Sequence, residues 1–176
     1  LHVFNAVYVN DFTFLYDYDV RHGLERYGAK AYFDKNYNII CIYVSHLNKI
    51  IYAKNDNISV DILYYKESDE LSQWRYAKYV WTTSVIAGVT VKDHAMFVHM
   101  IESNTLCTNT YENLPLKHYM RSLLSVFIYR TAYINQSIDK VLLKKFGLVH
   151  RIFGFEYSEI ERMCIFCRDN YTFIPF

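Results

Sequence analysis

Two histidines and an asparagine stand five residues apart, at His94, His99 and Asn104. Imidazole is a common ligand of iron, zinc and copper, and a carboxamide oxygen can serve as a weak, neutral one. On a regular α-helix, residues five apart are separated by about 140° around the axis, so these side chains would not share a face. They converge only if the helix widens into a π-type turn, which is rare and frequent at functional sites. The alternative is a buried helix whose histidines hydrogen-bond to the surrounding protein and which ends near Asn104.

A second candidate site is the C-x-x-C pair Cys164 and Cys167, which could be a redox-active dithiol or half of a zinc site. The sequence has no second C-x-x-C, and Ile165 and Phe166 between the two thiols are typical of a buried helix. Buried thiols that behave as small hydrophobes are therefore the favoured interpretation. The four cysteines are too few and too scattered for a disulfide framework.

The fold class that we predict is mainly α, with a small antiparallel β-hairpin or meander near residues 37–65. The runs YNIICIYVS, KIIYA and ISVDILYY are rich in β-branched and aromatic residues, and turn-like HLN and KNDN separate them. Residues 1–30 are expected to be irregular and to lead into a short helix that Gly28 ends. We expect one domain over residues 1–176, with an irregular and β part at 1–67 and a helical part at 68–176.

Helices should position the candidate residues. Ser68 is a plausible start of the first helix, which runs to Gly88, and Thr90 with Asp93 resembles a capping box that starts the second. The second helix carries His94 and His99 and is apolar on nearly every side, which predicts a position in the core. Further helices are expected over 116–129, over 131–147 with Gly147 at the end, and over 155–170.

Composition narrows the partners. Nineteen basic and eighteen acidic residues, with no basic tract, give no indication of nucleic acid. The hydrophobic content of 52%, with 18 Tyr and 12 Phe, predicts extensive apolar surface, part of it covered by other chains. No stretch reaches the roughly 18 apolar residues of a membrane span, so contact with a lipid or membrane surface stays open.

Several motifs together resemble the central segment of the lipoxygenase catalytic domain. Their order and approximate spacing agree over residues 74–145. The motifs are Trp74-x-x-Ala77-Lys78, His94-x4-His99-x4-Asn104, Lys117-His118 followed by Leu123-Leu124, and Ile134-Asn135. The short strand pair expected before Trp74 also agrees with that family.

The resemblance implies roles for four of these residues. His99 occupies the first iron-ligand position, and Asn104 stands where the second ligand histidine is expected. His94 corresponds to a neighbouring histidine that does not bind iron, and His118 to a structural residue at the start of the third helix. The family's remaining ligands come from a later helix and a C-terminal carboxylate; Phe176 could supply only the latter. We therefore expect vestigial iron positions at His99 and Asn104, no catalytic residue and no cofactor, with bound iron as the alternative.

The resemblance leads to three functional hypotheses. The first is a catalytically inactive lipoxygenase-like domain that serves as an accessory or structural subunit, bound to other protein subunits through a large apolar interface. The second is a non-haem iron dioxygenase of polyunsaturated fatty acids whose missing ligands come from another polypeptide. The third is a lipid- or pigment-binding module with an apolar cavity beside the His94 and His99 helix. The sequence indicates no compartment; an organellar membrane complex agrees with the first hypothesis.

Overall fold

The computed structural model describes residues 6–53 and 69–172. They gather into two compact units, residues 1–88 and 89–176. The first helix after the strands thus belongs with the sheet rather than with the later helices. The prediction of a single domain stays a prediction. The chain is mainly helical with a small antiparallel sheet, as predicted.

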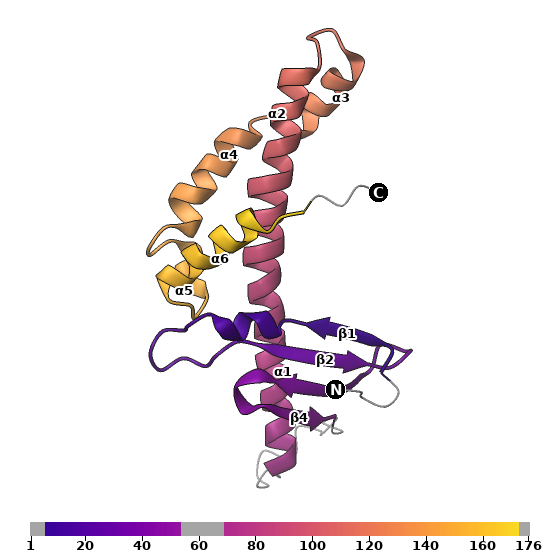
Figure 1. The fold of residues 1–176 in the computed structure, drawn as a ribbon, viewed down its shortest axis with the longest axis vertical. Helices are drawn as coiled ribbons and strands as arrows, with labels where there is room; N and C mark the ends of the chain where they lie inside the picture. Colours follow the sequence, from indigo (N-terminus) through magenta and orange to yellow (C-terminus); the bar gives the residue numbers. More distant parts are fainter. Residues whose placement is uncertain (1–5, 54–68, 173–176) are drawn as a thin grey trace, which may run out of the picture. The chain divides into compact units, whose positions relative to one another are not determined.

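The first unit contains a four-stranded antiparallel sheet in the order β1-β2-β3-β4 (Figure 1). The strands are β1 (Tyr8–Asp11), β2 (Ala29–Phe33), β3 (Ile39–Val44) and β4 (Lys49–Tyr52). The last two confirm the meander, and its third predicted run, residues 58–65, lies outside the described residues. The first two strands correct the expectation of an irregular segment, since Tyr8 pairs with Phe33 across a long connection.

The connection between β1 and β2 holds a 3-10 helix, η1 (Thr13–Asp17), in place of the expected helix before Gly28. Gly28 itself lies directly before β2 with φ of 110°, a conformation that side chains rarely adopt. A Cβ atom there would lie 2.7 Å from the Cβ atom of Tyr16. The glycine therefore permits a close chain crossing and does not end a helix.

Helix α1 (Asp69–Gly88) packs on the sheet, and its first turn carries the predicted acidic pair Asp69 and Glu70. The core joins strand residues to one face of the helix; its members are Ala29, Ala31, Ile42, Val44, Ile51, Leu71, Trp74, Ala77 and Val80. Ser84, which is fully buried, links the two layers. Its Oγ accepts a hydrogen bond from the Gly28 backbone N–H at 2.9 Å and donates to the Val80 carbonyl at 2.6 Å.

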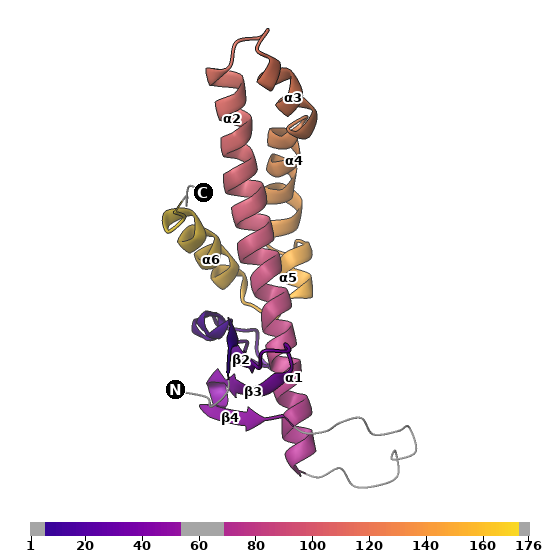
Figure 2. The same ribbon diagram turned by 90° about the vertical axis from the view of Figure 1, so that its right-hand side faces the viewer.

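The second unit consists of short helices around one long one (Figures 1 and 2). The short helices pack on the long one: α4 and α6 each contact η4, while α3 and α4 each contact α2. No described helix has the length and hydropathy to cross a bilayer. In chain order the elements are the π-helix η4 (Val89–Ser103), α2 (Asn104–Asn113), α3 (Tyr119–Phe127), α4 (Thr131–Ile138), the π-helix η5 (Asp139–Leu143), α5 (Leu148–Ile152) and α6 (Tyr157–Asp169).

Two predicted helix boundaries were wrong. The expected start at Thr90 does not exist, because the helical assignment continues from α1 into η4 and on to Asn113 without a break. Gly147 does not end a helix but precedes α5, with φ of −69°. A Cβ atom on it would lie 2.6 Å from the carbonyl oxygens of Leu142 and Val141, so the glycine is needed for close packing. Helices α3 and α6 lie within their predicted ranges.

Candidate functional site on the widened helix

The π-helix η4 brings His94 and His99 together. Their Nε2 atoms are 3.2 Å apart, their ring centroids are 4.7 Å apart, and the ring planes meet at 89°. Because a π-helix bonds residue i to residue i+5, side chains five positions apart come onto one face. The two side chains therefore converge, as the sequence allowed only for a widened helix. The widened helix extends over 15 residues.

Asn104 does not turn toward the histidine pair. Its Nδ2 donates to the Met100 carbonyl at 3.0 Å, and its Oδ1 accepts from Nδ2 of Asn135 on α4 at 2.8 Å. The carboxamide oxygen that would be the ligand atom is thus engaged in a contact between helices. Of the three residues five apart, the structure unites two and assigns the third to packing.

Asn135 on α4 binds the π-helix η4 through hydrogen bonds. The sequence analysis identified this residue only as part of the Ile134-Asn135 motif. The side chain is 3% exposed and its Nδ2 also donates to the His99 carbonyl at 2.6 Å. The same carbonyl accepts from Ser103 Oγ at 2.7 Å. Side-chain donors therefore satisfy a backbone oxygen of the widened helix, as buried polar groups require. No local signal singled it out, because Gln136 and Ser137 directly after it are also polar.

The expectation that this helix is buried on all sides was wrong. Only Val91, Ala95 and Met96 of η4 are buried, whereas His94 and Val98 are exposed. The reason is that α4 and α6 cover part of its circumference in the second unit. The histidine pair is consequently accessible to solvent through His94.

His118 lies at the start of α3, as expected. Its Nδ1 accepts a hydrogen bond from the Met120 backbone N–H at 3.2 Å, which satisfies one of the free donors of the first turn. This is a capping contact of a kind usually made by Ser, Thr, Asp or Asn. His118 therefore stabilises a helix end.

The residues do not fit an iron centre of the lipoxygenase type. Across residues 6–53 and 69–172, no group of three or more His, Cys, Asp or Glu side chains could hold a metal ion. His99 is present, but the oxygen of Asn104 already bonds to Asn135. A redox-cycling iron needs a ligand set that fixes both its potential and an iron-bound base.

The C-x-x-C pair lies on α6, where neither Cys164 nor Cys167 forms a disulfide and Cys167 is buried. Burial raises the pKa of Cys167 to about 11, chiefly because the charged thiolate would be desolvated. A thiol with a raised pKa is a poor nucleophile and a poor metal ligand near neutral pH. This argues against the redox and zinc interpretations.

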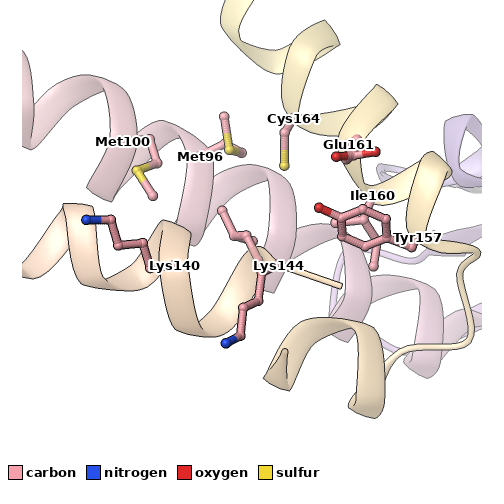
Figure 3. A pocket seen from close by; sticks show the side chains of 9 residues that line it. Met96, Met100, Lys140, Lys144, Tyr157, Ile160, Glu161 and Cys164 are labelled. Atoms are coloured by element: carbon pink, nitrogen blue, oxygen red, sulfur yellow. The ribbon is translucent and has the colours of Figure 1, made fainter. Parts of the chain in front are cut away.

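A cavity of about 610 Å³ borders η4 on the side that faces η5 and α6. Figure 3 shows Met96 and Met100 reaching in from the π-helix, with Ile160 and Cys164 from α6 opposite them. Polar groups also line it: Lys140, Lys144, Glu161 and Tyr157. The cavity is thus sulfur-rich and apolar inside, with charges of both signs among its lining residues.

Comparison with known proteins identifies no family. No protein-family model matches the chain, and no curated protein matches it. The likeness to lipoxygenases rests on the motifs quoted above and stays a prediction.

Proposed function

We propose that the chain is a catalytically inactive, lipoxygenase-like domain that serves as a structural or accessory subunit by docking on another protein. Two observations support this proposal. The first is the conversion of an expected iron ligand into a packing residue, since Asn104 bonds to Asn135. The second, which carries the docking function, is the orientation of α3.

Helix α3 turns its apolar face outward. Tyr119, Val126 and Phe127 are exposed by 71%, 74% and 74%, and Leu123 is also exposed. An amphipathic helix normally buries this face. In α3 no residue is buried, and exposed apolar side chains that share one face mark an interaction surface.

The side of α3 that faces its own unit carries the half-buried residues Arg121, Leu124 and Ser125. Arg121 donates from Nη1 to the carbonyl oxygens of Leu114 at 2.6 Å and Tyr111 at 3.1 Å, and its guanidinium lies 5.1 Å from the Tyr111 ring centroid. The arginine thereby satisfies backbone acceptors near the end of α2, which holds α3 in its inverted orientation. Rotating the apolar face inward would break these charge-assisted bonds.

The charge of this region indicates what kind of partner fits. Between Glu112 and Asp139 the sequence contains no acidic residue, whereas it contains Lys117, Arg121 and Arg130. Complementary potentials favour association and fix its orientation. The partner we propose is a protein with an apolar groove and acidic residues at its rim, of the helix-in-groove type.

Site-specific crosslinking in the native organism tests the docking function. Benzoylphenylalanine replaces Phe127 in one variant and Tyr37, which is 70% exposed in the first unit, in a control variant. We expect one crosslinked protein from position 127 and none from position 37, with loss of the product when Leu123→Asp is added. Adducts with lipid, with a second copy of the chain, or equally from both positions would contradict the proposal.

Metal content and activity test the lack of catalysis separately. Purified native protein should contain no stoichiometric iron and should form no hydroperoxide from linoleate, because the residues do not make an iron site. About one iron per chain that persists in His99→Ala combined with Asn104→Ala would show that ligands come from elsewhere. That result would favour the dioxygenase hypothesis.

The cavity beside η4 favours a second candidate, a lipid- or pigment-binding module. A space of about 610 Å³ next to Met96 and Met100 is within the usual range of ligand sites. Native mass spectrometry of the purified protein would then show a bound small molecule. Met100→Trp, which fills the cavity, should abolish that adduct, and Met120→Trp on exposed α3 should not. A protein without an adduct would contradict this second candidate.

A further inference from the structure

We infer that His94 and His99 form a two-imidazole chelating site for a late first-row divalent cation such as Zn²⁺ or Ni²⁺, with water completing the coordination. The site differs from the iron position that the resemblance implies, because it uses His94 in place of Asn104. It goes beyond the proposed function and does not depend on it.

The separation of the two nitrogens matches the span of one metal ion. With metal–nitrogen bonds of about 2.05 Å, an Nε2–Nε2 distance of 3.2 Å corresponds to a ligand–metal–ligand angle of roughly 100°. That angle lies between those of octahedral and tetrahedral coordination. A metal can therefore bind without moving the backbone of η4.

The tilt of the rings supports the same geometry. Two imidazoles that meet end to end along a straight N–H···N line would have centroids about 5.5 Å apart. Imidazoles that converge on one metal would have centroids about 5.0 Å apart. The observed 4.7 Å is closer to the second arrangement than to the first. Binding requires both rings to carry their proton on Nδ1, so that both Nε2 lone pairs are available.

The chemistry of the donors indicates the class of metal. Two neutral imidazoles provide nitrogen ligands without charge, and affinities of such sites rise from Fe²⁺ to Ni²⁺ and Cu²⁺. His94 is exposed and His99 is half-buried, which leaves space for metal-bound water on the solvent side. The site thus favours nickel, copper or zinc over iron.

Metal binding at this spacing is coupled to the shape of the helix. On an α-helix the two side chains would diverge by about 140° and could not share a metal. Only the π form of η4 can chelate, so a bound metal stabilises that form by an amount that grows with the logarithm of the metal concentration above the Kd. Metal should accordingly slow backbone hydrogen exchange across residues 89–103.

Calorimetric titration of the whole chain with Ni²⁺ alone tests the inference. We expect a one-to-one complex of micromolar affinity that His94→Gln and His99→Gln each weaken at least tenfold. His118→Gln, which alters a histidine at the start of α3, should retain the affinity. Hydrogen exchange of residues 89–103 should slow with Ni²⁺ in the unaltered protein and stay unchanged in His94→Gln. Circular dichroism of each variant verifies its helix content.

A relocated pair distinguishes the π-helix from an α-helix. In Val98→His combined with His99→Ala, the histidines stand four residues apart, a spacing that suits an α-helix. This variant should bind Ni²⁺ at least tenfold more weakly than the native pair. Tighter binding by the relocated pair, no binding by the native protein, or native affinity in His94→Gln would each overturn the inference.

Discussion

Asn135→Asp should destabilise the second unit strongly, because it replaces a buried donor by an acceptor of the same shape. The native Nδ2 donates to the His99 carbonyl at 2.6 Å and to Asn104 Oδ1 at 2.8 Å. The aspartate would leave Asn104 Oδ1 without its donor, whereas the His99 carbonyl keeps the hydrogen bond from Ser103 Oγ, and one unsatisfied buried group costs about 1–3 kcal/mol. The expected loss is therefore about 1–3 kcal/mol, a substantial fraction of the stability of a typical domain.

The same substitution should make stability depend on pH. A buried carboxylate that faces two acceptors is disfavoured in its charged form, so the pKa of Asp at position 135 rises above its unfolded value on folding. The protonated acid donates one hydrogen bond and retains part of the stability. Stability is thus highest at low pH and is lost as pH rises through the raised pKa, so the cost is smaller at pH 4 than at pH 7.

Hydrogen exchange measured by mass spectrometry is the appropriate assay. Both tryptophans, Trp74 and Trp81, belong to residues 1–88, so tryptophan fluorescence does not report on residues 89–176. The free energy of opening should fall in peptides that cover 95–110 and 131–138. Gln136→Glu, which adds one negative charge at an exposed neighbouring position, is the matched control. A cost below about 1 kcal/mol, or equal costs at both pH values, would refute the reasoning.

Three further predictions concern other buried contacts. Ser84→Ala should cost about 1–3 kcal/mol in urea unfolding followed by tryptophan fluorescence, because the Gly28 N–H loses its acceptor, while exposed Ser72→Ala should cost under about 0.5 kcal/mol. Gly28→Ala should destabilise by more than about 1 kcal/mol in the same assay, and a neutral effect would contradict the positive φ. Iodoacetamide at pH 8 should modify Cys164 before Cys167, whose pKa of about 11 keeps its thiol protonated; the reverse order would contradict its burial.

The sequence was most informative where the pattern was local. The ranges of α3 and α6 followed from their apolar spacing and flanking residues, and β3 and β4 followed from β-branched runs. The first two strands could not be predicted in this way. β1 is a four-residue edge strand, mostly exposed, and its pairing with β2 depends on contacts distant in sequence.

The sequence predicted the candidate site only on the condition that the helix is widened. The spacing of His94 and His99 showed that a widened helix would unite them, but it gave no sign that the π form extends over 15 residues. The hydrogen bonds from Asn135 to His99 and Asn104 depend on the packing of α4 against η4 and α2, which no local sequence pattern encodes. Gly147 was misassigned because a glycine is equally compatible with a helix end and with a tight approach to carbonyl oxygens.

The widened helix also bears on how this segment tolerates insertions and deletions. Loss of one residue between His94 and His99 would shorten their spacing from five to four. A π-helix could then return to the narrower α form, in which residues four apart are neighbours. The imidazoles would remain adjacent, but one deleted residue offsets the widening of only one turn. Because the π form extends over 15 residues, narrowing all of it would displace the helix that follows.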